Sequence, residues 1–340
     1  MTEPAKVTFV IVFRDAAEHL PGALAGLLAQ DYPPEKLQIL LVDGKSEDRS
    51  RRICEDFIAS HPERDVSILE NPGRLLACGW NIALAAATGE IILRVDAHAG
   101  IPADFVRRNA EAVARGHEIV GGPRLTILPE TFGKRLIALA EGSRFGSGAA
   151  AYRHEGAAGF VDTLAHAAYR RDVFARVGGY HELLERTEDN EIHGRMKRAG
   201  FRFWFDPSIR STHKARADLA AMLRQKYANG RGIGLTLAVA PGAFGLRHFV
   251  PGAFTAALGL SLILGYWPHL LALYFAAAAV FAAAAVRGER SPTGAAVPVL
   301  MVIFLLMHLA YGLGTLAGLA SLPFFRRSAA RYTVPRPVRA

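Results

Sequence analysis

Three long apolar blocks fill most of the last third of the chain, and they limit its possible folds more than any other feature. The blocks contain no Lys, Arg, Asp or Glu and cover residues 249–266, 269–286 and 295–322. A helix that crosses a membrane needs about 20 consecutive apolar residues, and each block is near or above that length. Buried helices of a soluble core are the alternative, but three such runs in succession favour membrane-spanning helices. Tyr266 and Trp267 also lie where an aromatic belt at the membrane interface would place them.

Basic residues flank these blocks. The formal net charge of +9 is compatible with nucleic acid, an anionic membrane or a phosphorylated ligand as partner. The residues that precede the first block or follow the last are Arg224, Lys226, Arg231, Arg247, Arg326, Arg327, Arg331, Arg336 and Arg339. This juxtamembrane placement favours a membrane and argues against nucleic acid. The two cysteines, Cys54 and Cys78, lack the spacing of a zinc site or a disulfide framework.

These patterns divide the chain into four predicted segments. We expect an α/β domain, an interfacial segment, transmembrane helices and a basic tail over residues 1–230, 231–248, 249–325 and 326–340. The N-terminus lacks the basic-then-apolar order of a signal peptide, so we expect a multi-pass protein of the cell membrane with a cytoplasmic first domain. Three crossings would place the basic tail outside, against the positive-inside tendency. Either the first block is monotopic, or the third block is re-entrant at its glycines, Gly312, Gly314 and Gly318.

The sequence before the apolar blocks alternates between strand and helix patterns. Val7–Phe13 is an apolar, β-branched run typical of a buried strand, and residues 18–30 carry leucines at helical spacing. The same order continues, with predicted strands and helices in turn over residues 38–42, 48–60, 66–69, 75–87 and 90–95. Such alternation predicts an α/β fold with a doubly wound, mostly parallel sheet. Residues 121–159 are rich in Gly, Ala and Ser, which predicts irregular chain that faces an acceptor or serves as a linker.

Acidic residues follow two of the predicted strands. Ligands of doubly wound sheets bind beyond the carboxyl ends of the strands, where Asp43 and Asp96 lie. Asp43 and Gly44 either form a tight turn or place a carboxylate that binds a nucleobase or ribose. Asp96 and His98 either cap a turn or hold one divalent ion, which would neutralise a diphosphate. Acids at two strand ends favour the binding hypotheses.

A third acidic cluster opens a predicted helix at Glu188, Asp189 and Glu191. The positive end of the helix dipole tolerates acids there, which is the purely structural interpretation. Three carboxylates within four positions nevertheless repel one another, a cost usually accepted where an acid serves as a base or a ligand. Asp189 is our candidate catalytic base, with Glu188 beside it.

Hydrogen-bond donors end the polar part of the chain. Arg224, Gln225 and Lys226 could hold a leaving diphosphate close to a bilayer. A positive collar at the membrane surface is the alternative, and one segment can serve both purposes.

Together these residues resemble a known family, the inverting glycosyltransferases of family two, which have the GT-A fold. The triplet Asp96-Ala97-His98, where many members have Asp-x-Asp, and the segment Gln225 to Gly232 are similar to the ExoA-type succinoglycan-biosynthesis glucosyltransferases within it. The resemblance covers nearly all of the chain before the apolar blocks. It implies a UDP-sugar donor, Mg²⁺ or Mn²⁺ as cofactor, and a lipid-linked saccharide or polysaccharide as acceptor.

The resemblance also implies roles for individual residues. Asp43 would bind the uracil or ribose, Asp96 the metal and diphosphate, and Asp189 would be the base. Asn81 matches a family asparagine near the nucleotide.

Gln225 and Lys226 match a family segment that closes over diphosphate and acceptor. Two positions depart from the family pattern. Arg14 stands in a nucleotide loop where relatives usually show Asn-Glu, and Tyr227 stands where processive synthases have Trp.

The sequence therefore predicts a membrane-anchored glycosyltransferase that moves a hexose, such as glucose, from a UDP-sugar to a lipid-linked or polysaccharide acceptor. A processive polysaccharide synthase is the alternative enzyme, which Tyr227 disfavours. A non-catalytic sugar-nucleotide-binding scaffold is a further alternative, which the presence of Asp189 argues against. A transporter is disfavoured because the apolar blocks hold no acidic or basic side chain to couple transport.

Overall fold

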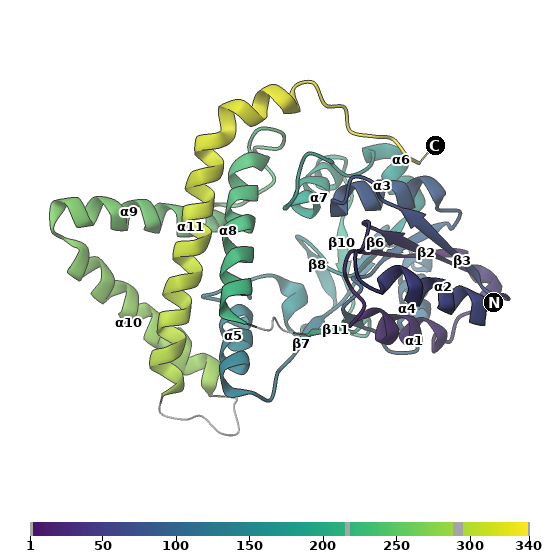
Figure 1. The fold of residues 1–340 in the computed structure, drawn as a ribbon, viewed down its shortest axis with the longest axis horizontal. Coiled ribbons are helices and arrows are strands. Elements are labelled where there is room, and N and C mark those ends of the chain that lie inside the picture. The colour runs from purple at the N-terminus through teal and green to yellow at the C-terminus, as the bar shows by residue number, and fades with distance from the viewer. Residues whose placement is uncertain (1–2, 215–217, 288–294, 339–340) are drawn as a thin grey trace. The chain divides into compact units, whose positions relative to one another are not determined.

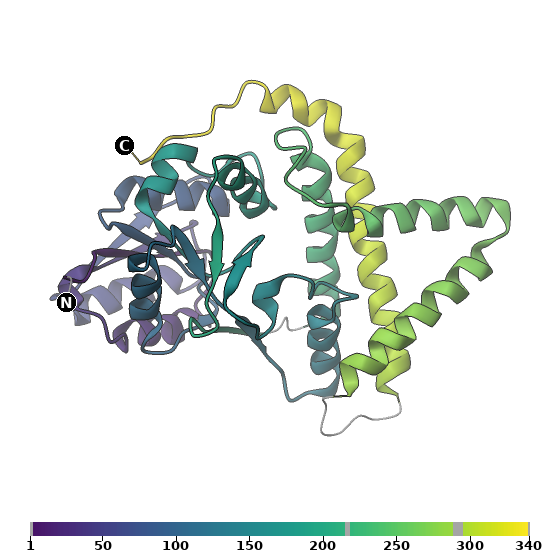
Figure 2. The same ribbon diagram turned by 180° about the vertical axis from the view of Figure 1, so that it is seen from behind.

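The chain divides into two compact units, drawn in Figures 1 and 2. The computed structural model describes residues 3–214, 218–287 and 295–338. The first unit comprises Met1–Leu125, His154–His213 and Thr333–Ala340, and the second comprises Thr126–Arg153 and Lys214–Tyr332. These bounds differ from the predicted segments, because 126–153 group with the apolar helices and the described part of the tail from Thr333 groups with the first unit. Residues 339 and 340 of the predicted tail, including Arg339, lie outside the described residues.

An eight-stranded, mostly parallel sheet forms the centre of the first unit, as predicted. Its strands follow the order β3-β2-β1-β4-β9-β6-β10-β8. They are β1 (Val7–Phe13), β2 (Leu37–Asp43), β3 (Asp65–Glu70), β4 (Ile91–Arg94), β6 (Ile119–Gly121), β8 (Gly159–Val161), β9 (Ala167–Arg170) and β10 (Phe203–Phe205). β1 pairs in parallel with both β2 and β4, so that Val7 lies opposite Leu37 and Ile91. The carboxyl ends of these three strands therefore meet at one edge of the sheet.

Helices cover both faces of this sheet, because its central strands are apolar on both sides. They are α1 (Leu20–Leu28), α2 (Ser50–Ser60), α3 (Leu76–Ala86), α4 (Phe105–Ala114), α6 (Arg171–Val177) and α7 (Glu188–Arg198). Phe9 and Ile11 of β1 pack with α1, α2 and α4, whereas Val10 and Val12 pack with α3, α6 and α7. A small second sheet joins β5 (Ala99–Gly100), β11 (Ser211–Lys214) and β7 (Arg124–Ile127).

The second unit is mainly helical. Its helices are α5 (Phe132–Gly142), α8 (Leu219–Thr236), α9 (Val250–Leu264), α10 (Trp267–Val286) and α11 (Ala296–Ala329). α5 lies in the stretch predicted to be irregular, so that prediction is wrong for residues 132–142. Leu136, Ile137 and Ala140 of α5 are buried in a hydrophobic cluster with residues of α8, α10 and α11. A helix this short is marginal alone, and packing partners far along the chain stabilise it.

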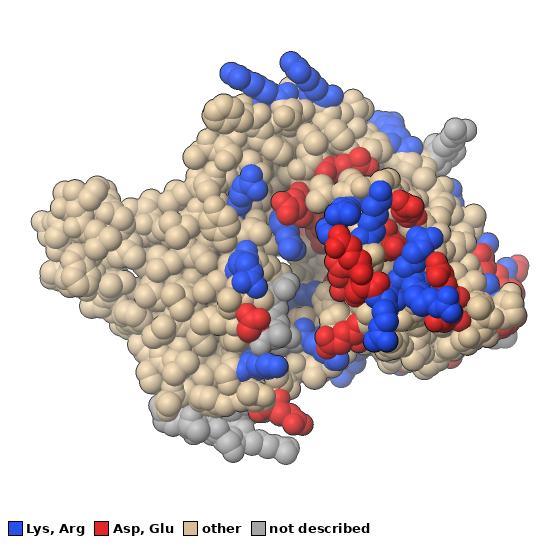
Figure 3. All heavy atoms as spheres, in the orientation of Figure 1, with Lys and Arg blue, Asp and Glu red and all other residues tan. Residues whose placement is uncertain are grey.

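Two described helices, α10 and α11, are long and apolar enough to cross a membrane. α9 is too short for the predicted first crossing, because its 15 residues span about 22 Å before Gly265 ends it in the left-handed region. α11 is a continuous helix, so the third block contains no re-entrant break. Its glycines instead permit close packing, since a Cβ on Gly314 would overlap the backbone of Tyr227 in α8. In Figure 3 the surface over α9 and α10 shows no charged side chains.

Candidate active site

Asp43 ends β2, and its carboxylate stabilises the turn that follows. The residue is 2% exposed, and Oδ1 accepts hydrogen bonds from the Ser46 backbone N–H at 2.9 Å and from its hydroxyl at 2.7 Å. The structure thus contains the tight turn, while Oδ2 lies 3.9 Å from the Arg51 guanidinium. Arg14, directly after β1, lies beside this turn, because a Cβ on Gly44 would be 3.1 Å from the Arg14 Cβ. Asp43 and Arg14 therefore share one edge of the sheet.

The loops after β1 and β2 hold each other through polar contacts. The Asp15 N–H donates to Ser46 Oγ at 2.9 Å, and the Glu47 N–H donates to Asp15 Oδ1 at 2.7 Å. Each loop has a non-glycine residue in the left-handed region, Asp15 with φ of 48° and Lys45 with φ of 58°. Such conformations are costly, persist only where surrounding contacts enforce them, and cluster at functional sites. The two loops form a fixed rim beside Asp43.

Asn81 lies within α3 and fastens a distant turn to that helix. Its Oδ1 accepts from the Tyr180 N–H at 2.7 Å, and its Nδ2 donates to the Tyr180 carbonyl at 2.9 Å and to Glu182 at 2.8 Å. Both polar ends of the buried side chain are thus engaged within the protein. The structure gives Asn81 a structural role, and its contact with the nucleotide stays a prediction.

Asp96 lies just beyond β4, where His166 and Arg124 contact its carboxylate. His166 Nε2 is 3.2 Å from Asp96 Oδ2, and an Arg124 nitrogen is 3.6 Å from the same oxygen. Burial alone would raise the pKa of Asp96, but the hydrogen bond to His166 and the charge of Arg94 outweigh it and hold that pKa well below its ordinary value. β1 separates the strands that carry Asp43 and Asp96, so these strands lie about 10 Å apart.

Asp96 and His98 present the donor forms that a divalent cation binds. Asp96 is held as a carboxylate, and burial lowers the pKa of His98, which keeps its imidazole neutral. Magnesium at phosphate sites is typically held by one or two protein groups, while phosphate oxygens and water complete its shell. Among the described residues, no group of three or more His, Cys, Asp or Glu is placed to hold a metal. Asp96 and His98 therefore fit a cation shared with a diphosphate, rather than an all-protein metal site.

Asp189, the candidate base, is held by Arg94. The two terminal nitrogens of Arg94 bind the two carboxylate oxygens, and the Nη2 to Oδ2 distance is 2.9 Å. The Arg94 side chain is 7% exposed at the end of β4, whereas the Asp189 side chain is 35% exposed in the first turn of α7. The guanidinium also lies over the Trp80 ring, 4.7 Å from its centre. The pair connects the strand that leads to Asp96 with the helix that carries the candidate base.

Glu188 and Asp189 are neighbours in sequence with different surroundings. Glu188 is 6% exposed, and burial together with the charge of Asp189 raises its pKa to about 8, against the opposing charge of Arg94. Glu188 is therefore mostly protonated at neutral pH, whereas Asp189 is more accessible and pairs with a cation. Carboxyl groups in such different environments commonly divide acid and base roles. Of the two, Asp189 is the one open to an acceptor hydroxyl.

The residues predicted to contact the diphosphate or the acceptor lie on α8 of the second unit, whereas the other candidates belong to the first. Arg224 is exposed and Gln225 is half-buried. Lys226 is buried, and its ammonium donates to Glu141 at 2.7 Å and to Ser147 at 2.8 Å. Lys226 thus ties α8 to the region of α5. A role toward diphosphate or acceptor stays a prediction for all three residues.

Three residues around these carboxylates are missing from the sequence-based prediction: Arg94, Arg124 and His166. The sequence did contain a signal for Arg94, because this residue ends an otherwise apolar strand. A charged residue is almost never fully buried without a partner, so its position indicates an ion pair. Arg124 and His166 had no such signal, since both lie far from Asp96 in sequence and only the fold brings them to it.

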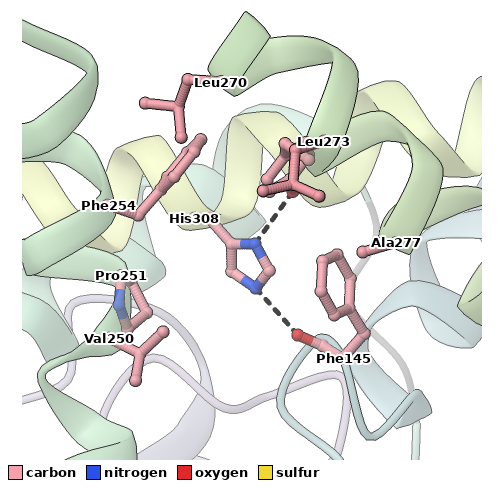
Figure 4. Close-up of a pocket in the computed structure, with 9 residues that line it drawn as sticks. Phe145, Val250, Pro251, Phe254, Leu270, Leu273, Ala277 and His308 are labelled. Carbon is pink, nitrogen blue, oxygen red and sulfur yellow. Dashed lines mark hydrogen bonds between the residues drawn. The ribbon is translucent and has the colours of Figure 1, made fainter. Parts of the chain in front are cut away.

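The second unit contains an apolar pocket between α9, α10 and α11 (Figure 4). Its volume is about 230 Å³, and its apolar lining includes Pro251, Phe254, Leu273 and Ala277. The polar lining residues satisfy each other, because His308 Nδ1 lies 2.9 Å from the Tyr274 hydroxyl and Nε2 lies 2.8 Å from the Phe145 carbonyl oxygen. Such a lining suits an apolar ligand with a chain-like shape.

The chain is similar in sequence to known glycosyltransferases. Residues 8–178 match the profile of the family described as Glycosyl transferase family 2. Succinoglycan biosynthesis protein ExoA of Rhizobium meliloti (strain 1021) is 30% identical over 311 residues, which cover 90% of this chain and 92% of that protein. A dolichyl N-acetyl-alpha-D-glucosaminyl phosphate 3-beta-D-2,3-diacetamido-2,3-dideoxy-beta-D-glucuronosyltransferase of Methanococcus voltae is 23% identical over 309 residues, or 88% of this chain and 93% of that protein.

Solved structures share the fold. The mannosyltransferase PcManGT from Pyrobaculum calidifontis, in complex with GDP-Man and Mn²⁺, aligns with a TM-score of 0.53 at 19% identity over 98% of this chain and 78% of its own. Residues 1–349 of S. aureus TarS, in complex with UDP, align with a TM-score of 0.51 at 15% identity over 96% of this chain and 93% of that one.

Proposed function

The chain belongs to glycosyl transferase family 2, and we propose that it transfers a hexose from a UDP-sugar to a lipid-linked saccharide with inversion at the anomeric carbon. The observation that carries this proposal is the Arg94–Asp189 pair, which presents a partly exposed carboxylate on a buried support. An inverting transfer needs a base on the acceptor side and stabilised charge on the leaving-group side. Asp189 meets the first need, and the strand end at Asp96 meets the second.

Asp189 takes the proton of the acceptor hydroxyl as that oxygen attacks the anomeric carbon. The bond to the diphosphate breaks on the opposite face, so the configuration inverts. Base assistance of this kind typically contributes about 10²- to 10⁴-fold. Arg94 orients the carboxylate, and protonated Glu188 adds no second negative charge beside it.

The nucleotide end of the donor lies at the carboxyl edge of the sheet. Asp43 and Arg14 bind the uracil or ribose, and Asn81 acts near the nucleotide. Asp96 and His98 would hold Mg²⁺ or Mn²⁺, which neutralises the diphosphate when bound.

The leaving diphosphate and the acceptor gain further donors from α8, namely Arg224, Gln225 and Lys226. Lys226 would need to exchange its contact with Glu141 for one with the ligand. The Mn²⁺ of the PcManGT complex supports use of a divalent ion in this fold.

A lipid-linked acceptor agrees with three observations. The relative from Methanococcus voltae is named as acting on a dolichyl-linked sugar phosphate. α10 and α11 are long enough to cross a membrane, and the apolar pocket beside α9 suits a lipid chain. The proposal includes a multi-pass anchor in the cell membrane, a cytoplasmic first unit, and residues 231–248 along the interface.

The test is transfer of labelled glucose from UDP-glucose into a lipid extract, by membranes that contain the protein and Mg²⁺ or Mn²⁺. We expect a lipid product with one added hexose of inverted configuration, lost with EDTA and with Asp189→Asn but kept with Asp31→Asn, an exposed control. Product from Asp189→Asn would remove Asp189 as base. Transfer only to water-soluble sugars would contradict the lipid acceptor, and long polymers would indicate a processive synthase.

A further inference from the structure

The last described residues of the chain are part of the first unit. Residues 333–338, here called the C-terminal strap, contain no helix or strand and lie near α6 (Figures 1 and 2). The Gly179 N–H donates to the Pro335 carbonyl at 2.8 Å. Val338 is 3% exposed and belongs to the hydrophobic cluster that includes Trp80 and Tyr180. The strap therefore completes the core on one face of the central sheet.

The strap packs on the Gly178-Gly179 turn, which has no room for side chains. Gly178 has φ of 80°, and a Cβ there would lie 3.1 Å from the Pro335 carbonyl oxygen. A Cβ on Gly179 would overlap Asn81 Oδ1 and lie 3.2 Å from the Pro337 ring. The turn is thus held between Asn81 of α3 and the strap.

The same turn is tied to α7, which carries Asp189. The Arg195 guanidinium on α7 donates to the Val177 carbonyl at 2.5 Å and to the Gly179 carbonyl at 2.6 Å. It also pairs with Glu191, one helical turn earlier, at 2.7 Å. A continuous set of contacts therefore leads from the strap through Gly179 and Arg195 to the helix of the candidate base.

We propose that the C-terminal strap is a positioning element for α7 and, through it, for Asp189. This rests on the proposed function in so far as Asp189 is the base.

A second consequence of the docked strap concerns the number of membrane crossings. The chain leaves the first unit after His213 and returns to it at Thr333, so any membrane region between them begins and ends on one side. It then makes an even number of crossings, which α10 and α11 can supply.

The positioning role is tested with a chain that ends at Tyr332 and with Val338→Asp, which places a charge in the core. Arg336→Asp, at an exposed position of the strap, is the matched control. We expect amide hydrogen exchange in residues 175–199 to rise about 10-fold or more in both test variants, because the protecting contacts are lost. We expect kcat to fall about 10- to 100-fold while KM for the UDP-sugar changes less than about 2-fold, because a displaced base slows chemistry more than donor binding. A peptide of residues 331–338 should restore turnover to the shortened chain.

Unchanged exchange in residues 175–199 after truncation would overturn the proposal, whatever reaction the enzyme performs. Equal loss of kcat in Arg336→Asp and Val338→Asp would also overturn it.

The sidedness is tested by cysteine labelling in sealed vesicles. Arg336→Cys in the strap and Arg52→Cys on exposed α2 are compared in a Cys78→Ser background, with a membrane-impermeant maleimide. Labelling of both from the same side is expected. Labelling from opposite sides would show that the strap is not docked in the membrane-bound protein.

Discussion

Arg94 and Asp189 stand 95 residues apart in the sequence and meet as a two-point ion pair between a central strand and the first turn of a helix. Two parallel N–H···O bonds fix the plane of the carboxylate as well as its position. Thr187, just before α7, adopts the left-handed region with φ of 69°, which directs the chain into this helix. The candidate base is therefore oriented before any substrate arrives.

Replacement of Arg94 by lysine tests the value of that orientation. Lysine keeps the positive charge but offers a single flexible point of contact. We expect kcat to fall about 10- to 100-fold with KM for the UDP-sugar nearly unchanged, since a small misplacement of a reacting group costs about 10²-fold. The matched control is Arg107→Lys, which alters an exposed pair with Asp31. Equal kcat for wild type and Arg94→Lys would contradict the orienting role.

Glu188 should make the stability of the protein depend on pH. Folding raises the pKa of Glu188 from 4.5 to about 8, so the folded state binds more protons than the unfolded state between these values. The contribution of Glu188 to the free energy of unfolding therefore falls as the pH rises through this window. The glutamine in Glu188→Gln cannot ionise. Relative to wild type, the free energy of unfolding of this variant should therefore rise by on the order of 3 kcal/mol from pH 5 to pH 8. Denaturant unfolding in detergent at several pH values measures this. Parallel curves for wild type and Glu188→Gln would refute it, and exposed Glu63→Gln serves as the control.

Asp43 has two separable roles, one in its turn and one toward the nucleotide. Asp43→Ala removes the carboxylate, whereas Ser46→Ala keeps it and removes the hydroxyl that donates to it and accepts from the Asp15 N–H. A hydrogen bond to a charged group contributes about 1.5–3 kcal/mol, so we expect UDP to bind at least about 10-fold more weakly to Asp43→Ala. Ser46→Ala should retain its affinity within about 3-fold. Isothermal titration with UDP measures both, and similar affinities would limit Asp43 to the turn.

The residues that line the apolar pocket all belong to the second unit, so the pocket can be filled by one substitution there. Ala277→Trp places a large ring in it, while Ala276→Trp places the same ring on the neighbouring exposed position. We expect transfer to the lipid acceptor to fall about 10-fold or more in Ala277→Trp only, because the apolar chain of the acceptor can no longer enter the pocket. UDP binding should be equal in both. Equal transfer rates would show that the acceptor does not use this pocket.

Local patterns were sufficient to predict four strands of the sheet, β1, β2, β3 and β4. The strand over Val7–Phe13 is found as predicted, because a continuous apolar run that is buried on both faces has few other ways to fold. α7 likewise begins at Glu188, where the acidic first turn predicts a helix start. The miss at α5 has the opposite cause, since its stability comes from partners beyond residue 218 that no local pattern reveals.

The sequence was sufficient to predict which residues lie at the candidate site, but not which side chains contact one another there. Strand ends identify Asp43 and Asp96 because parallel strands bring their carboxyl ends to one edge. The pairing of Arg94 with Asp189, and of His166 with Asp96, depends on how helices and strands cross in space. Burial of Glu188 beside an accessible Asp189 is equally invisible in a run of three acids. These are properties of the folded chain, not of its local sequence.

Val338 is synthesised after the apolar helices but packs in the core of the first unit. The ribosome makes the sheet first, then the apolar helices, and only afterwards the valine that closes the cluster around Trp80 and Tyr180. The core of the first unit therefore lacks this residue until the apolar helices α9, α10 and α11 have been made. A chain interrupted anywhere in α10 or α11 lacks Val338, so full packing of the first unit requires that both of these apolar helices have been synthesised.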